Sequence, residues 1–111
     1  MAKSENYKTF EKRLKGVNSK KKRLGLIEQL DTTDESIIKE KEMITKELLF
    51  FESAINSLET VDKNIIESNY LDKMSMIKIA EETNYTACVC SRKKVKAVKH
   101  LMYLMTGIKE D

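Results

Sequence analysis

Apolar residues recur every three or four positions along most of the chain, which is the spacing of an amphipathic α-helix. The first series is Tyr7, Phe10, Leu14 and Val17, and a second resumes after Lys21 with Leu24, Ile27 and Leu30. Gly16 and Gly25 each allow a bend, so we expect either one bent helix or two helices here. No stretch alternates with the period of two that marks a β-strand, and the pattern therefore predicts an all-α fold.

A heptad repeat follows a polar connector, Asp31-Thr32-Thr33-Asp34, which is rich in residues that cap helices. Apolar residues then fall every seven positions, with two more in the alternate seam: Ile37, Ile44, Phe51 and Leu58, then Leu48 and Ile55. A repeat of this kind packs against another helix. Two interpretations stay open: the stripe packs on the first segment as an internal helical hairpin, or it also joins two copies as a coiled-coil arm. We assign residues 1–59 to this hairpin.

Three shorter helices are expected after residue 59. Hydroxyl residues stand where each would begin, and the helices and their caps are 61–70 after Thr60, 76–83 after Ser75, and 87–105 after Thr86. The inward side of the first would hold Val61, Ile65, Ile66 and Tyr70. Asn84 and Tyr85 form a tight turn before the last helix, and Gly107 ends it.

Two helices joined by a short turn and preceded by a third are typical of a helix-turn-helix, whose second helix lies in the major groove of DNA. Ala80 supplies the small residue that a close helix crossing needs. The small core that fixes the crossing would be Ile79, Cys90, Ala97 and Leu101. We therefore expect residues 60–111 to form a three-helix DNA-binding domain.

The last helix has an inner apolar side and an outer polar one. Near its N-terminal end the candidate base-contacting residues are Thr86, Ala87, Cys88, Ser91 and Arg92. Arg92 is the best candidate for reading guanine, because its planar fork matches two acceptors at once. The candidate phosphate contacts are Ser75, Lys78, Lys94, Lys96 and Lys99. Such contacts give affinity and salt dependence but little choice of sequence.

The distribution of charge tells more than the net charge of +3. Residues 3–23 hold nine Lys or Arg against two Glu, residues 86–101 hold five Lys or Arg and no acid, and residues 34–60 hold seven acids against three bases. This pattern indicates either an electrostatic footprint for nucleic acid or complementary helices within one fold. The run Lys20–Arg23 would contact DNA or polymerase, or it would pair with the acidic helix. The apolar tail Leu101, Met102, Leu104 and Met105 would pack on the hairpin or join a dimer.

Enzyme, metal and membrane chemistry find no support in the sequence. There is no glycine-rich phosphate loop and no nucleophile beside a base, so we expect no catalytic residue and no cofactor. Cys88 and Cys90 point to opposite sides of one helix, and His100 is some three turns away, so we expect free thiols and no metal site. No signal peptide is visible, and the longest apolar run is too short to span a bilayer, which favours a cytoplasmic protein.

Residues 54–101 resemble a known family. The matching positions are Ala54 to Leu58, Val61, Ile65-Ile66, Ile79-Ala80-Glu81-Glu82, Asn84-Tyr85-Thr86, Cys90, Arg92-Lys93, Ala97 and Leu101. They look like the C-terminal module of the phage ArpU/RinA-type transcriptional regulators, which is itself similar to region 4 of sigma factors. The resemblance implies a cytoplasmic regulator encoded by a phage or prophage, often an activator of late genes. Ile77-Lys78 replaces the family's usual acidic pair, which leaves the target sequence open.

The sequence thus predicts a non-enzymatic, sequence-specific regulator that binds double-stranded DNA as a homodimer and can contact RNA polymerase. An alternative is a helical adaptor or inhibitor that acts on host RNA polymerase or another host factor, which the heptad stripe would serve. A third is a small-terminase-like packaging protein, which also pairs a helix-turn-helix with long helices.

Overall fold

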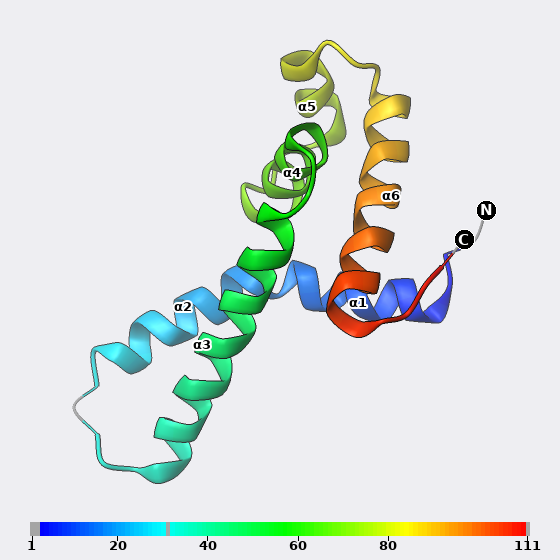
Figure 1. Cartoon of the computed structure of the whole chain (residues 1–111). Helices are drawn as coiled ribbons and strands as arrows, with labels where there is room; N and C mark the ends of the chain where they lie inside the picture. Colours follow the sequence, from blue (N-terminus) through cyan, green and yellow to red (C-terminus); the bar gives the residue numbers. More distant parts are fainter. Residues whose placement is uncertain (1–2, 31, 111) are drawn as a thin grey trace.

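Helices follow one another along nearly all of the described chain, which comprises residues 3–30 and 32–110 of the computed structural model. In order they are α1 (Glu5–Lys15), α2 (Val17–Glu28), α3 (Glu35–Asn56), α4 (Thr60–Ile66), the π-helical turn η1 (Glu67–Leu71), α5 (Met76–Thr83) and α6 (Ala87–Thr106) (Figure 1). The described residues contain no strand, and the all-α prediction is confirmed.

The first apolar segment forms two helices that meet at Gly16. The Gly16 N–H donates to the carbonyls of Lys12 and Arg13 at 3.1 and 3.2 Å, so α1 ends there and α2 begins at the next residue. Gly25 lies inside α2 and does not interrupt it. The apolar side of α1 is turned inward as its spacing predicts, because Tyr7, Phe10 and Leu14 are buried.

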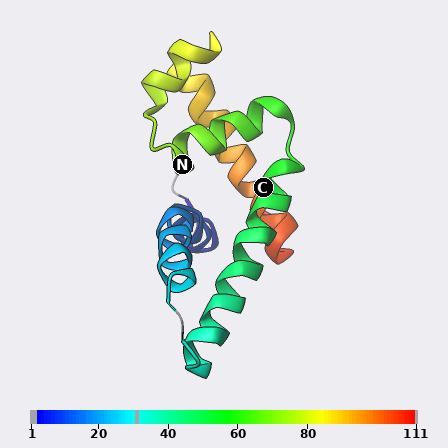
Figure 2. The same ribbon diagram turned by 90° about the vertical axis from the view of Figure 1, so that its left-hand side faces the viewer.

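α3 folds back along α2 to form the helical hairpin that the heptad pattern predicted (Figures 1 and 2). The Asp34 side chain caps the start of α3 by accepting the N–H of Ser36 at 2.9 Å. Asp31, the first residue of the expected connector, lies outside the described residues. Ile44, Phe51 and Ile55 are buried, so the heptad stripe packs inside the molecule. We call α2 together with residues 35–50 of α3 the arm.

Ion pairs join the basic run of α2 to the acidic side of α3. Lys20 pairs with Glu47, and Arg13 of α1 reaches the same carboxylate at 3.5 Å. The hydrogen bond from Lys20 holds the pKa of Glu47 below its usual range. Arg23 donates to Glu40 at 2.9 Å. Lys20 and Arg23 therefore pair with the acidic helix, which is one of the two roles expected of this run.

The start of α4 differs from the prediction. Glu59, not Thr60, occupies the N-cap position, and no side chain makes a capping bond there. Val61 is exposed, because the short connection after α3 leaves it on the outer side of the first turn. The other three residues expected on the inner side, Ile65, Ile66 and Tyr70, are buried as predicted.

The helix expected to run through residue 70 changes its winding at η1. The N–H of Asp72 reaches back to the carbonyl of Glu67 at 3.0 Å, which is the longer hydrogen-bond step of a π-helix. Asn18 of α2 donates from Nδ2 to the carbonyl of Leu71 at 2.6 Å, so a tertiary contact satisfies an acceptor that the widened turn leaves open. Lys73 follows in the left-handed region (φ 58°) and turns the chain toward α5.

One core joins the N-terminal helices to α6. Its buried residues are Tyr7, Phe10, Leu14, Val17, Phe51, Ala54, Ile55, Leu58, Ile66, Tyr70, Ala97, Val98, Leu101 and Met102. The core therefore crosses the boundary expected at residue 59, and the apolar end of α6 packs against the hairpin. A second cluster, Ile65, Ile79 and Cys90, lies under α5. The small core expected for the helix-turn-helix is thus divided, with Ala97 and Leu101 in the larger cluster.

Candidate nucleic-acid interface

α5 and α6 are joined by a short turn, and each of the two helices begins at a residue whose side chain caps it. The Ser75 hydroxyl accepts the N–H of Lys78 at 3.2 Å, and the Thr86 hydroxyl accepts the N–H of Val89 at 3.2 Å. Asn84 adopts the left-handed conformation (φ 64°) that ends α5, which Asn tolerates better than most residues. Both caps and the turn were predicted, and together they set α5 beside the N-terminal half of α6 (Figure 1).

A small apolar cluster holds α5 against α6. Ile79 of α5, Cys90 of α6 and Ile65 of α4 are all buried, and Ala80 packs partly against them. The Thr83 hydroxyl donates to the Ile79 carbonyl at 2.9 Å and lies 3.5 Å from the Cys90 sulfur. The inner side of α6 is therefore fixed at its N-terminal end, which determines which side chains face outward.

Four of the five residues expected to contact bases lie on the outer surface at the start of α6. Thr86, Cys88, Ser91 and Arg92 are exposed, and Ala87 is half-buried. No other helix covers Ser91 or Arg92. The structure thus leaves this surface, which we call the reading face, exposed to solvent.

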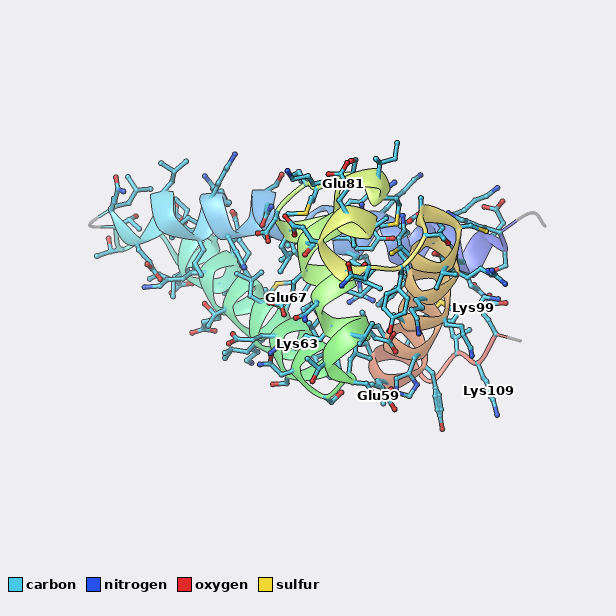
Figure 3. The ribbon with its side chains drawn as sticks, turned by 90° about the horizontal axis from the view of Figure 1, so that it is seen from above. Glu59, Lys63, Glu67, Glu81, Lys99 and Lys109 are labelled. Atoms are coloured by element: carbon cyan, nitrogen blue, oxygen red, sulfur yellow. The ribbon has the colours of Figure 1, made fainter. Side chains whose placement is uncertain are left out.

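The residues expected to contact phosphates are divided. Ser75 and Lys78 are exposed at the start of α5, and Lys96 is exposed on α6. Lys99 is half-buried beside an open groove of about 1190 Å³, which α6 shares with the turn between α3 and α4. Figure 3 shows Lys99, Lys109 and Glu59, which come from three segments that line this groove.

Lys94 does not lie with the exposed lysines. Its ammonium group is 3.9 Å from the Glu11 carboxylate and 5.1 Å from the centroid of the Tyr70 ring, and only 19% of its side chain is exposed. Lys94 falls on the side of α6 that packs against α1 and η1. We therefore remove Lys94 from the phosphate-contacting set.

Glu11 is the centre of a partly buried polar cluster between α1, η1 and α6. The Tyr70 hydroxyl donates to its carboxylate at 2.5 Å, and Lys3, Lys15 and Lys94 lie 3.8–4.0 Å away. Burial alone would raise the pKa of Glu11, but this hydrogen bond and the three positive charges outweigh it and hold the pKa below its usual range. Burial lowers the pKa of Lys94, and Glu11 opposes that shift.

Replacing Glu11 with glutamine should destabilise the protein in a pH-dependent way. Because the pKa of Glu11 is lowered in the folded state, its contribution is present above the unfolded pKa and is lost as pH falls through the folded pKa. We expect Glu11→Gln to lower the free energy of unfolding by about 1–3 kcal/mol at neutral pH. The difference from wild type should shrink below about pH 4.

Urea denaturation at several pH values measures this difference. Glu5→Gln is the matched control on the same helix, because 91% of the Glu5 side chain is exposed. This variant should change stability by less than about 0.5 kcal/mol. A Glu11→Gln deficit of equal size at pH 7 and pH 3 would contradict the assigned ionic role.

Two basic residues that line the open groove were not assigned a role from the sequence. The Lys93 ammonium group lies 5.2 Å from the centroid of the Tyr85 ring, which orders it beside the turn. Lys109 follows the end of α6 and lines the open groove. The sequence signal for Lys93 was its place in the acid-free stretch, whereas nothing in the local pattern connects Lys109 to the groove.

The remaining chemistry of the described chain is plain. Cys88 is exposed, Cys90 is buried, and both are free thiols, as expected. Residues 3–30 and 32–110 hold no group of side chains suited to binding a metal ion. Over the same residues, none of the helices combines the length and apolar character that crossing a membrane requires.

Comparison with protein families, with curated proteins and with solved structures finds no match for this chain.

Proposed function

We propose that this protein is a sequence-specific DNA-binding regulator that places the N-terminal half of α6 in the major groove. The observation that carries the proposal is the reading face. It lies at the capped N-terminus of a 20-residue helix, is exposed, and belongs to a stretch with five basic residues and no acid. A helix N-terminus carries partial positive charge, which favours approach to phosphates.

In this proposal some side chains contact bases and others contact phosphates. Arg92 reads a guanine through two hydrogen bonds, and Ser91, Cys88 and Thr86 contact neighbouring base edges or the backbone. Ser75 and Lys78 at the start of α5 contact phosphates on one side of the DNA major groove. Lys96 and Lys99 contact the phosphates on its other side. We assign the two pairs of residues to opposite sides because α5 flanks one side of α6 and the open groove of the protein flanks the other.

The biological setting of the proposal comes from the family resemblance. A regulator of the phage or prophage type would act in the bacterial cytoplasm, without catalysis, on promoters that its host polymerase also uses. A homodimer would read two half-sites about one helical turn apart.

Titration of mixed-sequence duplex DNA against salt tests the electrostatic part of the proposal. Wild-type protein should bind at low salt, with log K falling linearly as log salt rises. Lys96→Ala should weaken binding to all sequences alike and reduce the slope by about one. Lys12→Ala, an exposed lysine on α1, is the control and should leave the slope unchanged.

Absence of DNA binding at low salt would contradict the proposal, as would equal losses from Lys12→Ala and Lys96→Ala. Capture of host RNA polymerase from a nuclease-treated lysate by a protein that ignores DNA would favour the adaptor function instead.

A further inference from the structure

The arm exposes large apolar side chains although its two helices pack on each other. They are Leu26, Ile38, Met43, Leu49 and Phe50. Met43 is 71% exposed and Leu26 is 59% exposed, whereas Leu14 and Leu101 of the core are fully buried. A hairpin that stands away from the body gives each helix a single neighbour, which explains why these residues lack cover (Figures 1 and 2).

Three of these residues share one side of the hairpin, which we call the arm face: Leu26 on α2, with Met43 and Phe50 on α3. The other side of the hairpin holds a groove lined by Lys21 of α2 and Leu48 of α3. At 100° per residue, Lys21 and Leu48 lie to one side of the α2–α3 contact, and the arm face lies to the other. Leu26, Met43 and Phe50 therefore lie on one side of the hairpin, where the Arg23–Glu40 ion pair joins the two helices between them.

Charged residues alternate along the edge of α3 that points away from α2. They are Glu35, Lys39, Glu42 and Lys46, all exposed, spaced four, three and four residues apart. This order is complementary to itself when two such helices run antiparallel. Glu35 then faces Lys46 of the second helix, and Lys39 faces Glu42. A parallel arrangement would set like charges against each other, so the pattern selects both a second copy and its direction.

We propose that two copies of this chain pair through their arm faces, antiparallel, to form a four-helix bundle. The register set by the charges also places Met43 near the level of Leu26 of the second copy. The face is about 24 Å long and two helices wide, which gives roughly 500 Å² per copy. Stable complexes bury about 800 Å² per partner, so this dimer dissociates on dilution. The proposal stands independently of DNA binding.

Sedimentation equilibrium of the full chain without DNA, over a wide concentration range, tests the interface. Wild type should shift from monomer to dimer. Met43→Ser with Phe50→Ser should raise the dissociation constant at least about tenfold. The control is Ile77→Ser on α5, because Ile77 is 68% exposed but lies off the arm, and it should leave the constant unchanged.

A charge exchange tests the direction. Lys39→Glu alone and Glu42→Lys alone should each weaken the dimer, because each sets like charges against each other twice by symmetry. The two changes in one chain should restore wild-type dimerisation. A chain that stays monomeric at all concentrations would overturn the proposal. So would a dimer that Met43→Ser with Phe50→Ser leaves intact, or single charge changes that the double change does not rescue.

Discussion

Replacing Leu101 with alanine should lower the free energy of unfolding by about 2–5 kcal/mol, the usual cost of truncating a buried leucine. Leu101 is fully buried, and it lies in the core that joins the N-terminal helices to α6. Because that core belongs to both halves, the variant should destabilise them together. Urea denaturation followed by circular dichroism, and by hydrogen exchange at amides of α1 and α6, measures the loss.

The control for this prediction is Leu104→Ala on the same helix. Leu104 is 43% exposed, so its truncation should cost less than about 0.5 kcal/mol beyond any change in helix propensity. Equal losses from the two variants would contradict the assigned core. Separate unfolding of α1 and α6 in the Leu101 variant would show that the two halves fold independently.

Replacing Arg92 with alanine should cost about 1–3 kcal/mol of binding to a selected DNA site and relax the choice of base at one position. Arg92 is exposed on the reading face, one turn beyond the capped start of α6, where a helix in the major groove reaches base edges. The physical reason is the loss of two hydrogen bonds from the guanidinium, because guanine is the only base that presents two acceptors together in the major groove. Fluorescence anisotropy with the selected duplex and its single-base variants measures both effects.

Two further variants separate base reading from charge. Arg92→Lys keeps the positive charge but loses the planar fork, so it should lose discrimination nearly as much as the alanine variant does. Lys96→Ala should weaken all duplexes alike and leave the base preference intact. A common small loss for all three variants, with the preference unchanged, would remove Arg92 from the reading role.

The helix boundaries of the C-terminal half could be predicted because their signals are local. Ser75 and Thr86 cap the helices that follow them, and Asn84 takes the left-handed conformation at the turn. Each of these depends on contacts within three or four residues, which a sequence displays directly. Thr60 shows the limit of the rule, since a hydroxyl near a helix start does not become a cap unless the backbone enters at the right residue.

The partner of Lys94 could not be predicted, because it depends on a helix some eighty residues earlier. Glu11 reaches Lys94 and Tyr70 only after α1 has crossed α6 and η1, and no local pattern connects them. The π-helical turn was not predicted either, and the bond from Asn18 to Leu71 that accompanies it is also long-range. The periodicity of apolar residues correctly separated the inner side of α6 from its outer side. It did not indicate that α1 would also cover Lys94.

α3 carries apolar residues at seven-residue intervals on two of its sides, one buried in the hairpin and one exposed. Burial of Ile44, Phe51 and Ile55 confirms the internal hairpin, since these residues pack within the chain. The residues that we propose for self-association, Met43 and Phe50, repeat at the same interval on a different side of α3. A heptad count alone does not distinguish the two seams. The exposed fractions do.

We propose that the outer side at the start of α6, from Thr86 to Arg92, reads DNA sequence. Selection of duplexes from a random pool by the purified protein tests it most directly. We expect enrichment of a short motif that contains a guanine whose selection disappears with Arg92→Ala and survives Lys96→Ala. A pool that stays random after repeated rounds, or a motif that Arg92→Ala leaves whole, would contradict it.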